Sequence, residues 1–307
     1  MTNPFNLDPD VVYGTAVRLA PQVRRLTVRN GTPMTFTGTQ TYLVGTGDVA
    51  VIDPGPVNDT HVGDVLNALE DGERVAAILL THTHIDHSPG AAALKAATGA
   101  KTYAFGQHGA GMSQMMIDLA ASGADLGGGE GADRDFAPDV TVADSEVLEF
   151  GGVRLTALHT PGHLSNHLAF AMEDGAVFTG DLIMGWATTL VSPPDGDMAA
   201  FLASLAMMRQ REDRVYYPGH GHPVEDTMGM VDHQIAHRKS RVDQIVAALG
   251  KGSATPRGLT EMIYTDVNPA LHGAAARNVF AALLGLAAEG RCAAQGGLSP
   301  DAVFELT

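Results

Sequence analysis

The densest group of metal-ligating side chains in this sequence lies in Thr81-His82-Thr83-His84-Ile85-Asp86-His87. Three histidines and one aspartate fall within six residues, directly after the apolar segment Ala76–Leu80. Neutral imidazoles and ionised carboxylates held close together are electrostatically unfavourable unless a cation lies between them. A solvated polar loop is the alternative, but the chance placement of four such side chains directly after a buried strand is improbable. The stretch therefore predicts a metal site.

Three later segments repeat the placement of a ligand-capable side chain after a short apolar strand. In each of them a glycine that allows close backbone approach directly precedes the side chain. These side chains are His163, Asp181 and His220, which follow the apolar segments 153–158, 176–178 and 215–217. The only cysteine is Cys292, so nitrogen and oxygen atoms must supply the metal ligands. Four such groups in one chain form a much stronger signal than any one of them alone.

The segments that must position these groups alternate between strand-like and helix-like patterns. Residues 41–44 and 49–52 are rich in β-forming residues and are separated by a glycine-containing turn. Apolar residues at helical spacing predict a helix over 61–69, and residues 91–97 form an alanine-rich helical segment. Further strands are predicted at 74–80, 140–142, 147–150, 153–158, 168–172 and 176–178. This mixture predicts an α+β fold.

The segment from Phe105 to Asp139 departs from this regular pattern. It contains Met112, Met115 and Met116 and a glycine-rich stretch over 127–131. Such segments are usually surface excursions, and a lid or substrate wall is the functional alternative. We expect it to lie near the metal site, because the strands on either side of it carry the ligands.

The last 70 residues predict a separate helical module. A long helix is expected over about 230–249, followed by a hinge-like linker at 250–255, two helices at 257–264 and 271–290, and a β-like tail. Three helices that end in a small hairpin are typical of a winged helix. We therefore divide the chain into a main domain that carries the predicted metal site, residues 1–237, and a C-terminal winged-helix-like domain, residues 238–307.

The charge is strongly asymmetric. The formal net charge is −16, and residues 238–307 hold seven Lys/Arg and six Asp/Glu, so the first 237 residues carry −17. An acidic surface repels polyanions and disfavours generic nucleic-acid binding by the main domain. The polar N-terminus and the lack of an uninterrupted apolar run of about 18–20 residues predict a cytoplasmic protein with no membrane association.

The H-x-H-x-D-H motif and the later ligands resemble those of the metallo-β-lactamase superfamily, over about residues 37–223. This resemblance implies a four-layer αββα sandwich with the site at one edge, between two sheets. It also implies that His82, His84 and His163 hold a first metal, that Asp86, His87 and His220 hold a second, and that Asp181 bridges them. Such a set favours two divalent ions over one, with Zn²⁺ preferred and Fe and Mn left open.

A more specific resemblance is to the β-lactamase-like protein 2 family, which joins this domain to a C-terminal winged helix. The matching segments are 38–47, 52–55, 160–163 with His167, 179–185 with 188–189, and 217–221. This resemblance implies endonuclease activity on single-stranded RNA.

Several functions remain open from the sequence. We favour a dinuclear hydrolase that uses a metal-bridging hydroxide on an ester, thioester or lactone of a small acyl compound. The alternatives are a metal-dependent endoribonuclease acting on single-stranded RNA, a mononuclear iron dioxygenase of the persulfide type, and a non-catalytic winged-helix interaction protein. A homodimer through residues 105–139 or the C-terminal helices is an open expectation.

The predicted catalytic residues are Asp86, Asp181 and His167, the last either orienting a ligand or donating a proton. We expect His61 and His108 at the surface. The basic cluster Arg238, Lys239 and Arg241 is expected on a solvated helix face, with contact to a substrate phosphate or carboxylate as the alternative. Tyr42 is expected beneath the site, and Met184 and Trp186 either in the core or along a substrate pocket.

Overall fold

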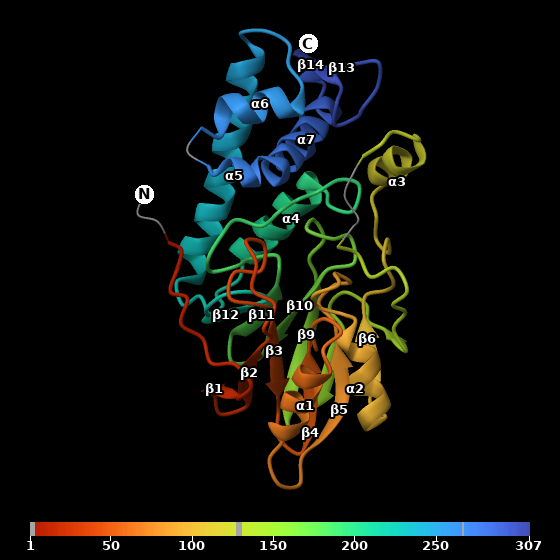
Figure 1. Cartoon of the computed structure of the whole chain (residues 1–307), viewed down its shortest axis with the longest axis vertical. Helices are drawn as coiled ribbons and strands as arrows, with labels where there is room; N and C mark the ends of the chain where they lie inside the picture. The colour runs from red at the N-terminus through yellow and green to blue at the C-terminus, as the bar shows by residue number, and fades with distance from the viewer. Residues whose placement is uncertain (1–3, 127–130, 266) are drawn as a thin grey trace.

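Two β-sheets packed face to face, with helices on their outer faces, form the main part of the computed structural model (Figure 1). The structure describes residues 4–126, 131–265 and 267–307. Within these residues the first sheet has seven strands in chain order: β1 (Val17–Ala20), β2 (Val23–Thr27), β3 (Gln40–Val44), β4 (Asp48–Ile52), β5 (Arg74–Leu79), β6 (Lys101–Ala104) and β7 (Val140–Thr141). The second sheet has five, in the order β12 (Val215–Pro218), β11 (Ala176–Gly180), β10 (Leu168–Met172), β9 (Val153–His159) and β8 (Val147–Phe150).

Strand direction places the carboxyl ends of the ligand-bearing strands at one edge. Strands β4 and β5 pair parallel, as do β11 and β12. Strand β10 is antiparallel to both β9 and β11, so β9 runs in the same direction as β11. The loops that follow β5, β9, β11 and β12 therefore leave their sheets at corresponding ends, where their side chains can meet.

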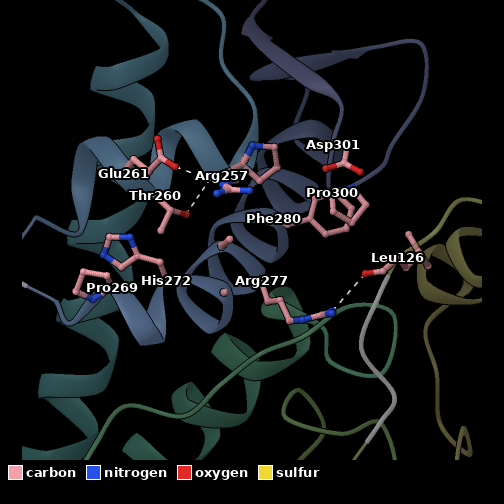
Figure 2. Close-up of a pocket in the computed structure, with 13 residues that line it drawn as sticks. Leu126, Arg257, Thr260, Glu261, Pro269, His272, Arg277, Phe280, Pro300 and Asp301 are labelled. Carbon is pink, nitrogen blue, oxygen red and sulfur yellow. Dashed lines mark hydrogen bonds and ion pairs between the residues drawn. The ribbon is translucent and has the colours of Figure 1, made fainter.

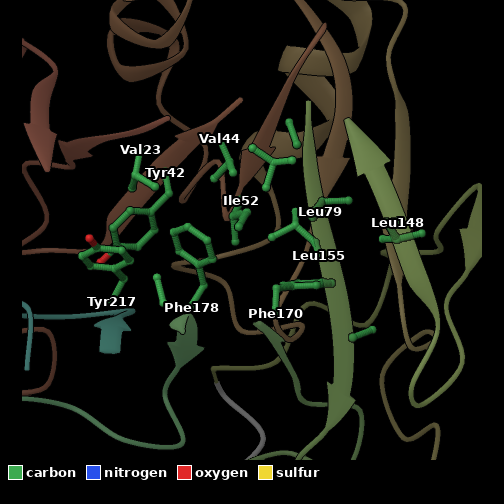
Figure 3. Packing of buried hydrophobic residues seen from close by; sticks show 14 of the residues in the cluster. Val23, Tyr42, Val44, Ile52, Leu79, Leu148, Leu155, Phe170, Phe178 and Tyr217 are labelled. Atoms are coloured by element: carbon green, nitrogen blue, oxygen red, sulfur yellow. The ribbon is translucent and has the colours of Figure 1, made fainter. Parts of the chain in front are cut away.

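Side chains alternate along the strands and so form two cores. On β3, Tyr42 and Val44 face the second sheet, whereas Leu43 faces the outer helices. Phe170 and Phe178 from the second sheet complete the inner core (Figure 3). The Tyr42 hydroxyl donates to the carbonyl of Pro218 (2.7 Å), which lies at the start of the loop that carries His220. The prediction that Tyr42 packs beneath the site is confirmed.

Helices cover the outer face of each sheet and complete four layers. Helices α1 (Asp59–Asn67) and α2 (Gly90–Thr98) pack on the first sheet, and α4 (Met198–Arg209) and the first half of α5 (Thr227–Leu249) pack on the second. Asn58 and Asp197 cap the amino ends of α1 and α4 with side-chain hydrogen bonds, and α2 ends at Gly99 with a φ of 74°. The predicted α+β fold and αββα layering are confirmed.

The C-terminal module consists of the second half of α5 with α6 (Pro256–Ile263), η1 (Pro269–Leu271), α7 (His272–Ala288), β13 (Cys292–Gln295) and β14 (Val303–Leu306). The predicted domain boundary at 237/238 falls inside the continuous helix α5. Around it the packing partners of α5 change: Val231 contacts the main domain, whereas Ile245 and Leu249 contact the module.

The segment Phe105–Asp139 contains helix α3 (Gln114–Ala121), which packs on the C-terminal module rather than on the sheets (Figure 1). Met116 and Leu119 join the apolar core formed by α5, α6 and α7. Further along, the backbone of Gly131 accepts a hydrogen bond from the amide of Ile85 (2.8 Å). One end of the segment thus reaches the predicted metal site, and residues 127–130 of its glycine-rich stretch lie outside the described residues.

Helix α7 with the preceding turn is the one segment of the described residues that is long and apolar enough to cross a membrane, Pro269–Ala288. Its side chains Phe280 and Leu283 are almost completely buried in the core of the C-terminal module. The apolar character of this helix is therefore accounted for by packing within the protein.

His61 is buried, so the prediction that it lies at the surface is wrong. Its side chain is 3% exposed, and Nε2 lies 2.8 Å from the hydroxyl of Thr41 on β3. Burial disfavours the charged imidazolium and lowers the pKa of His61 to about 4. The sequence placed His61 on a helix that is partly polar, but its Thr41 partner lies on a distant strand.

Acidification is expected to destabilise the protein partly through His61. Because the folded-state pKa lies below the usual value of 6.5, the contribution is complete above pH 6.5 and is lost as the pH falls towards 4. The His61→Gln variant lacks this titration, so between pH 6.5 and 4 it should lose about 1–3 kcal/mol less unfolding free energy than the wild type. Urea unfolding at both pH values measures this difference, and equal losses would contradict it.

Candidate metal centre

Four loops bring the seven predicted ligands together at one edge of the sandwich. The first loop carries His82, His84, Asp86 and His87, and the other three carry one ligand each. Within the described residues, these side chains form two adjoining groups. Inside each group, the potential ligand atoms all lie within 4.8 Å of one another. A third such group joins His82 and His87 to Asp53, which was not predicted as a ligand from the sequence.

The first cluster consists of His82, His84, His163 and Asp181. Nδ1 of His84 lies 3.0 Å from Nε2 of His82 and 2.9 Å from Nε2 of His163. Oδ2 of Asp181 lies 3.6 Å from Nε2 of His163. Three imidazole nitrogens thus converge on one point beside a carboxylate oxygen.

The second cluster consists of Asp86, His87 and His220. Nε2 of His87 and Nε2 of His220 lie 3.3 Å apart, and Oδ2 of Asp86 is 3.2 Å from His220 and 3.6 Å from His87. Both imidazoles are almost fully buried, whereas the Asp86 side chain is 24% exposed. Asp86 therefore lies where the cluster meets solvent.

Asp181 lies between the two clusters. Its Oδ2 is 3.6 Å from His163 in the first cluster and 3.4 Å from His220 in the second, and its Oδ1 is 3.6 Å from His87. Oδ1 is buried and has no hydrogen-bond donor among the described residues. An ionised carboxylate in this position requires positive charge on both sides.

The donor set fits two divalent cations. Ligand atoms about 2.1 Å from a tetrahedral Zn²⁺ are separated from one another by about 3.4 Å. The separations of 2.9–3.6 Å among the ligand atoms lie around that value. With no sulfur ligand, the two clusters suit divalent metals that accept nitrogen and oxygen.

The protonation of the two clusters differs. Burial and the neighbouring His163 lower the pKa of His84 to about 3, and burial lowers the pKa of His82 well below its usual value. In the second cluster burial also lowers the pKa of His87, but the carboxylates of Asp86, Asp181 and Asp53 outweigh it and raise the pKa to about 9. The first cluster is therefore ready for a cation at neutral pH, whereas a cation in the second displaces a proton.

Each cluster has a ligand anchored through its second ring nitrogen. Nδ1 of His163 lies 2.7 Å from the carbonyl of Leu190, and Nδ1 of His220 lies 3.2 Å from the carbonyl of Gly38. These contacts make Nδ1 the donor in both rings, which leaves Nε2 free to bind a metal.

Asp53 is the partner of His87 and was missed as a site residue by the sequence analysis. Its Oδ2 lies 2.9 Å from Nδ1 of His87, and its carboxylate accepts hydrogen bonds from the amide (2.8 Å) and hydroxyl (2.6 Å) of Thr81. The available signal was an aspartate directly after β4. This aspartate can be connected with the site only once β4 is known to pair in parallel with β5, because the carboxyl ends of both strands then lie side by side. The first ligand loop follows β5.

The Asp53→Asn variant is expected to weaken metal binding at the second cluster by about 10–100-fold, because the amide no longer provides the charge that orients His87. Calorimetric titration of the metal-free protein with Zn²⁺ measures the affinity. Asp48→Asn, which alters an exposed carboxylate at the opposite end of β4, serves as the control. Equal affinities in the Asp53 variant and the wild type would contradict the orienting role.

His167 is completely buried behind the ligands. Its Nδ1 lies 2.8 Å from the hydroxyl of Thr160, and its Nε2 accepts a hydrogen bond from the backbone amide of Asp181 (3.1 Å). Both ring nitrogens are thus engaged with the protein. Of the two predicted roles we propose the orienting one, in which His167 holds the backbone of Asp181.

Two further expectations about charged residues are wrong. His108 is largely buried, and its Nε2 lies 3.1 Å from Asp195. In the basic cluster only Arg238 departs from the expected solvated helix face: it is 3% exposed and contacts backbone and side-chain oxygens, whereas Lys239 is exposed as expected and Arg241 is half-buried. Met184 is buried, whereas Trp186 is half-buried and stacks on Phe36 with ring centroids 5.2 Å apart.

Comparison with known proteins assigns the family. Residues 34–220 match the metallo-beta-lactamase superfamily, which is more than half of the chain. The chain belongs to the metallo-β-lactamase superfamily. It is a hydrolase of this superfamily, and residues 255–298 match the beta-lactamase associated winged helix domain, so the predicted C-terminal winged helix is confirmed.

Individual relatives match most of the length of this chain. The Beta-lactamase-like protein 2 homolog of Drosophila melanogaster is 29% identical, and the match covers 89% of this chain and 90% of the relative. The Atrochrysone carboxyl ACP thioesterase dmxR1 of a Cryptosporiopsis species is 28% identical over 81% of this chain and 74% of the relative. A metallo-beta-lactamase family protein of Thermus thermophilus has the same fold, with a TM-score of 0.75, 23% identity, and coverage of 94% of this chain and 100% of that protein.

Proposed function

We propose that this superfamily member is a dinuclear metal-dependent hydrolase of acyl thioesters. The observation that carries the proposal is the position of Asp181, whose carboxylate faces both clusters within 3.4–3.6 Å. When bound, two divalent metals supply a water molecule activated at neutral pH and positive charge for an oxyanion. One metal would be held by His82, His84 and His163. The other would be held by Asp86, His87 and His220, and Asp181 would contribute to both. Zn²⁺ is the preferred ion for these ligands.

Hydrogen bonds within the chain hold the ligands of this site in place. Asp53 and the carbonyls of Leu190 and Gly38 each fix one imidazole, and His167 fixes the backbone of Asp181. Such preorganisation removes the need to reorient these groups during the reaction. The partly exposed Asp86 lies on the side from which a substrate enters.

Trp186 provides a candidate wall for the acyl group. It stacks on Phe36 and lies against Gly221, next to the ligand His220: a Cβ on Gly221 would be 3.0 Å from the indole. An apolar aromatic surface beside a polar centre is typical of pockets that bind apolar substrates. We propose that this pair contacts the acyl chain.

Thioesters are favoured over RNA by two features. Several relatives of 25–29% identity are named Atrochrysone carboxyl ACP thioesterase, and the chain covers more than two thirds of their lengths. The formal net charge of −16 opposes the approach of a polyanion. Endonuclease activity on single-stranded RNA remains the second candidate, because the likeness to the β-lactamase-like protein 2 homolog spans both domains.

The test is a direct comparison of substrates under one set of conditions. We expect hydrolysis of acyl thioesters, followed with a thiol-reactive dye, that stops on chelation, returns with Zn²⁺ or Mn²⁺, and is absent from the His84→Ala variant. Labelled single-stranded RNA should remain intact in the same buffer. Cleavage of the RNA with the same metal dependence, together with intact thioesters, would overturn the proposal in favour of the nuclease.

A further inference from the structure

The loop of residues 187–192 links the metal centre to the C-terminal helices. It contains no helix or strand, so its shape depends on contacts with the rest of the chain. The carbonyl of Leu190 in this loop is the partner of His163 Nδ1, at 2.7 Å. Any shift of the loop therefore moves the acceptor that orients a metal ligand of the first cluster.

The C-terminal helices hold this loop with three polar side chains. Arg238 on α5 donates from Nη2 to the carbonyl of Thr189 and from Nη1 to Oδ1 of Asn278 (3.0 Å). The same Oδ1 of Asn278, on α7, accepts the backbone amide of Val191 (2.9 Å). The contacts to Thr189 and Val191 flank Leu190, so its carbonyl is fixed from both neighbours.

A third contact comes from the next residue of α7. Arg277 donates to the hydroxyl of Ser192 (3.1 Å) and to the carbonyl of Leu126 (3.3 Å). Figure 2 shows its side chain pointing away from the body of α7 towards Leu126; both residues line a cavity of about 540 Å³. The side chains of Arg277 and Asn278 thus reach the same loop from one turn of one helix.

Arg238 is buried without a carboxylate partner among the described residues. Its side chain is 3% exposed, and the ion pairs of these residues do not include it. Burial lowers its pKa to about 10, so the guanidinium remains charged at neutral pH. The guanidinium lies over the ring of Phe201, 5.1 Å from its centroid, and donates to the carbonyl of Thr189 and to Asn278. A buried cation without a carboxylate partner costs stability, and these contacts offset part of that cost. Its hydrogen bonds are thus directed at the loop of residues 187–192 and at Asn278, which holds the same loop.

We propose that Arg238 and Asn278 are positioning residues for His163, through which the C-terminal module sets the metal affinity of the first cluster. The inference concerns metal binding and holds whatever the substrate is. Thr189 also donates to the carbonyl of Asp181 (2.8 Å), but the amide of Asp181 is held separately by His167. The effect is therefore expected at His163 rather than at both clusters.

The test is a titration of the metal-free, full-length protein with Co²⁺ in competition with a chromophoric chelator. His163→Ala and His220→Ala identify which binding phase belongs to which cluster. In Arg238→Met we expect affinity at the first cluster to fall about 10–100-fold, with affinity at the second unchanged. Arg241→Met is the matched control, because Arg241 lies on the same helix but stacks on Tyr264 and donates within the module.

Asn278 provides a second test that does not depend on the folding of the Arg238 variant. Asn278→Ala should weaken the first cluster like Arg238→Met, whereas Asn278→Asp keeps the acceptor for Val191 and Arg238 and should retain wild-type affinity. If these contacts only stabilise the fold, Asn278→Ala should lower the melting temperature and leave the ratio of the metal affinities of the first and second clusters unchanged. That result, or an equal loss at both clusters, would overturn the proposal.

Discussion

Replacing Asp181 by asparagine is expected to lower kcat/KM by at least roughly 10³-fold, which corresponds to about 4 kcal/mol of transition-state stabilisation. The substitution keeps the shape of the side chain, but removes the negative charge that faces His163 on one side and His87 and His220 on the other. Without this charge, the binding of both proposed metals should weaken. Steady-state hydrolysis of the thioester and metal content per chain provide the two measurements.

Asp174→Asn is the control for this variant. Asp174 lies in the turn between β10 and β11 and pairs with Arg214 at the protein surface (2.6 Å), so its replacement should leave activity and metal content unchanged. If the Asp181→Asn variant retains two metals per chain and also wild-type kcat/KM, the proposed role of Asp181 is contradicted.

Truncation of Phe170 to alanine is expected to destabilise the protein by about 3–5 kcal/mol. Phe170 is fully buried on β10, in the middle of the second sheet, and its ring fills the space between the sheets (Figure 3). The variant leaves a cavity that the strands on either side cannot close. Urea unfolding in the presence of a chelator measures the loss without a contribution from bound metal.

Val147→Ala provides the comparison on the same sheet. Val147 lies on the edge strand β8 and is 42% exposed, so its truncation should change the unfolding free energy by less than about 1 kcal/mol. Similar losses in the two variants would show that the space between the sheets is not the main core.

The ligand positions were predictable from the sequence because each follows its own strand end within a few residues. A buried strand, a glycine and a polar side chain are local signals, and His82 or His163 can be found from neighbours in the chain alone. Family resemblance then assigned the ligands to two metals. The helical C-terminal module was predictable for a similar reason, since the period of its apolar residues is local.

The residues that support the ligands were not predictable in the same way. Asp53 acts on His87 across two parallel strands, and Arg238 acts on Thr189 from a helix 49 residues further along the chain. The role of Asp53 depends on the order of the strands in the sheet, and the role of Arg238 depends on the position of the loop of residues 187–192. His61 and Arg238 were expected at the surface because polar residue types usually lie there, and only their distant partners explain their burial.

The central claim is that this chain holds two metals through the seven ligands. Elemental analysis of protein purified without a metal-binding tag tests it most directly. We predict about two Zn, Mn or Fe ions per chain, falling to about one in the His220→Ala variant. One iron per wild-type chain, or no metal after supplementation, would contradict the dinuclear centre.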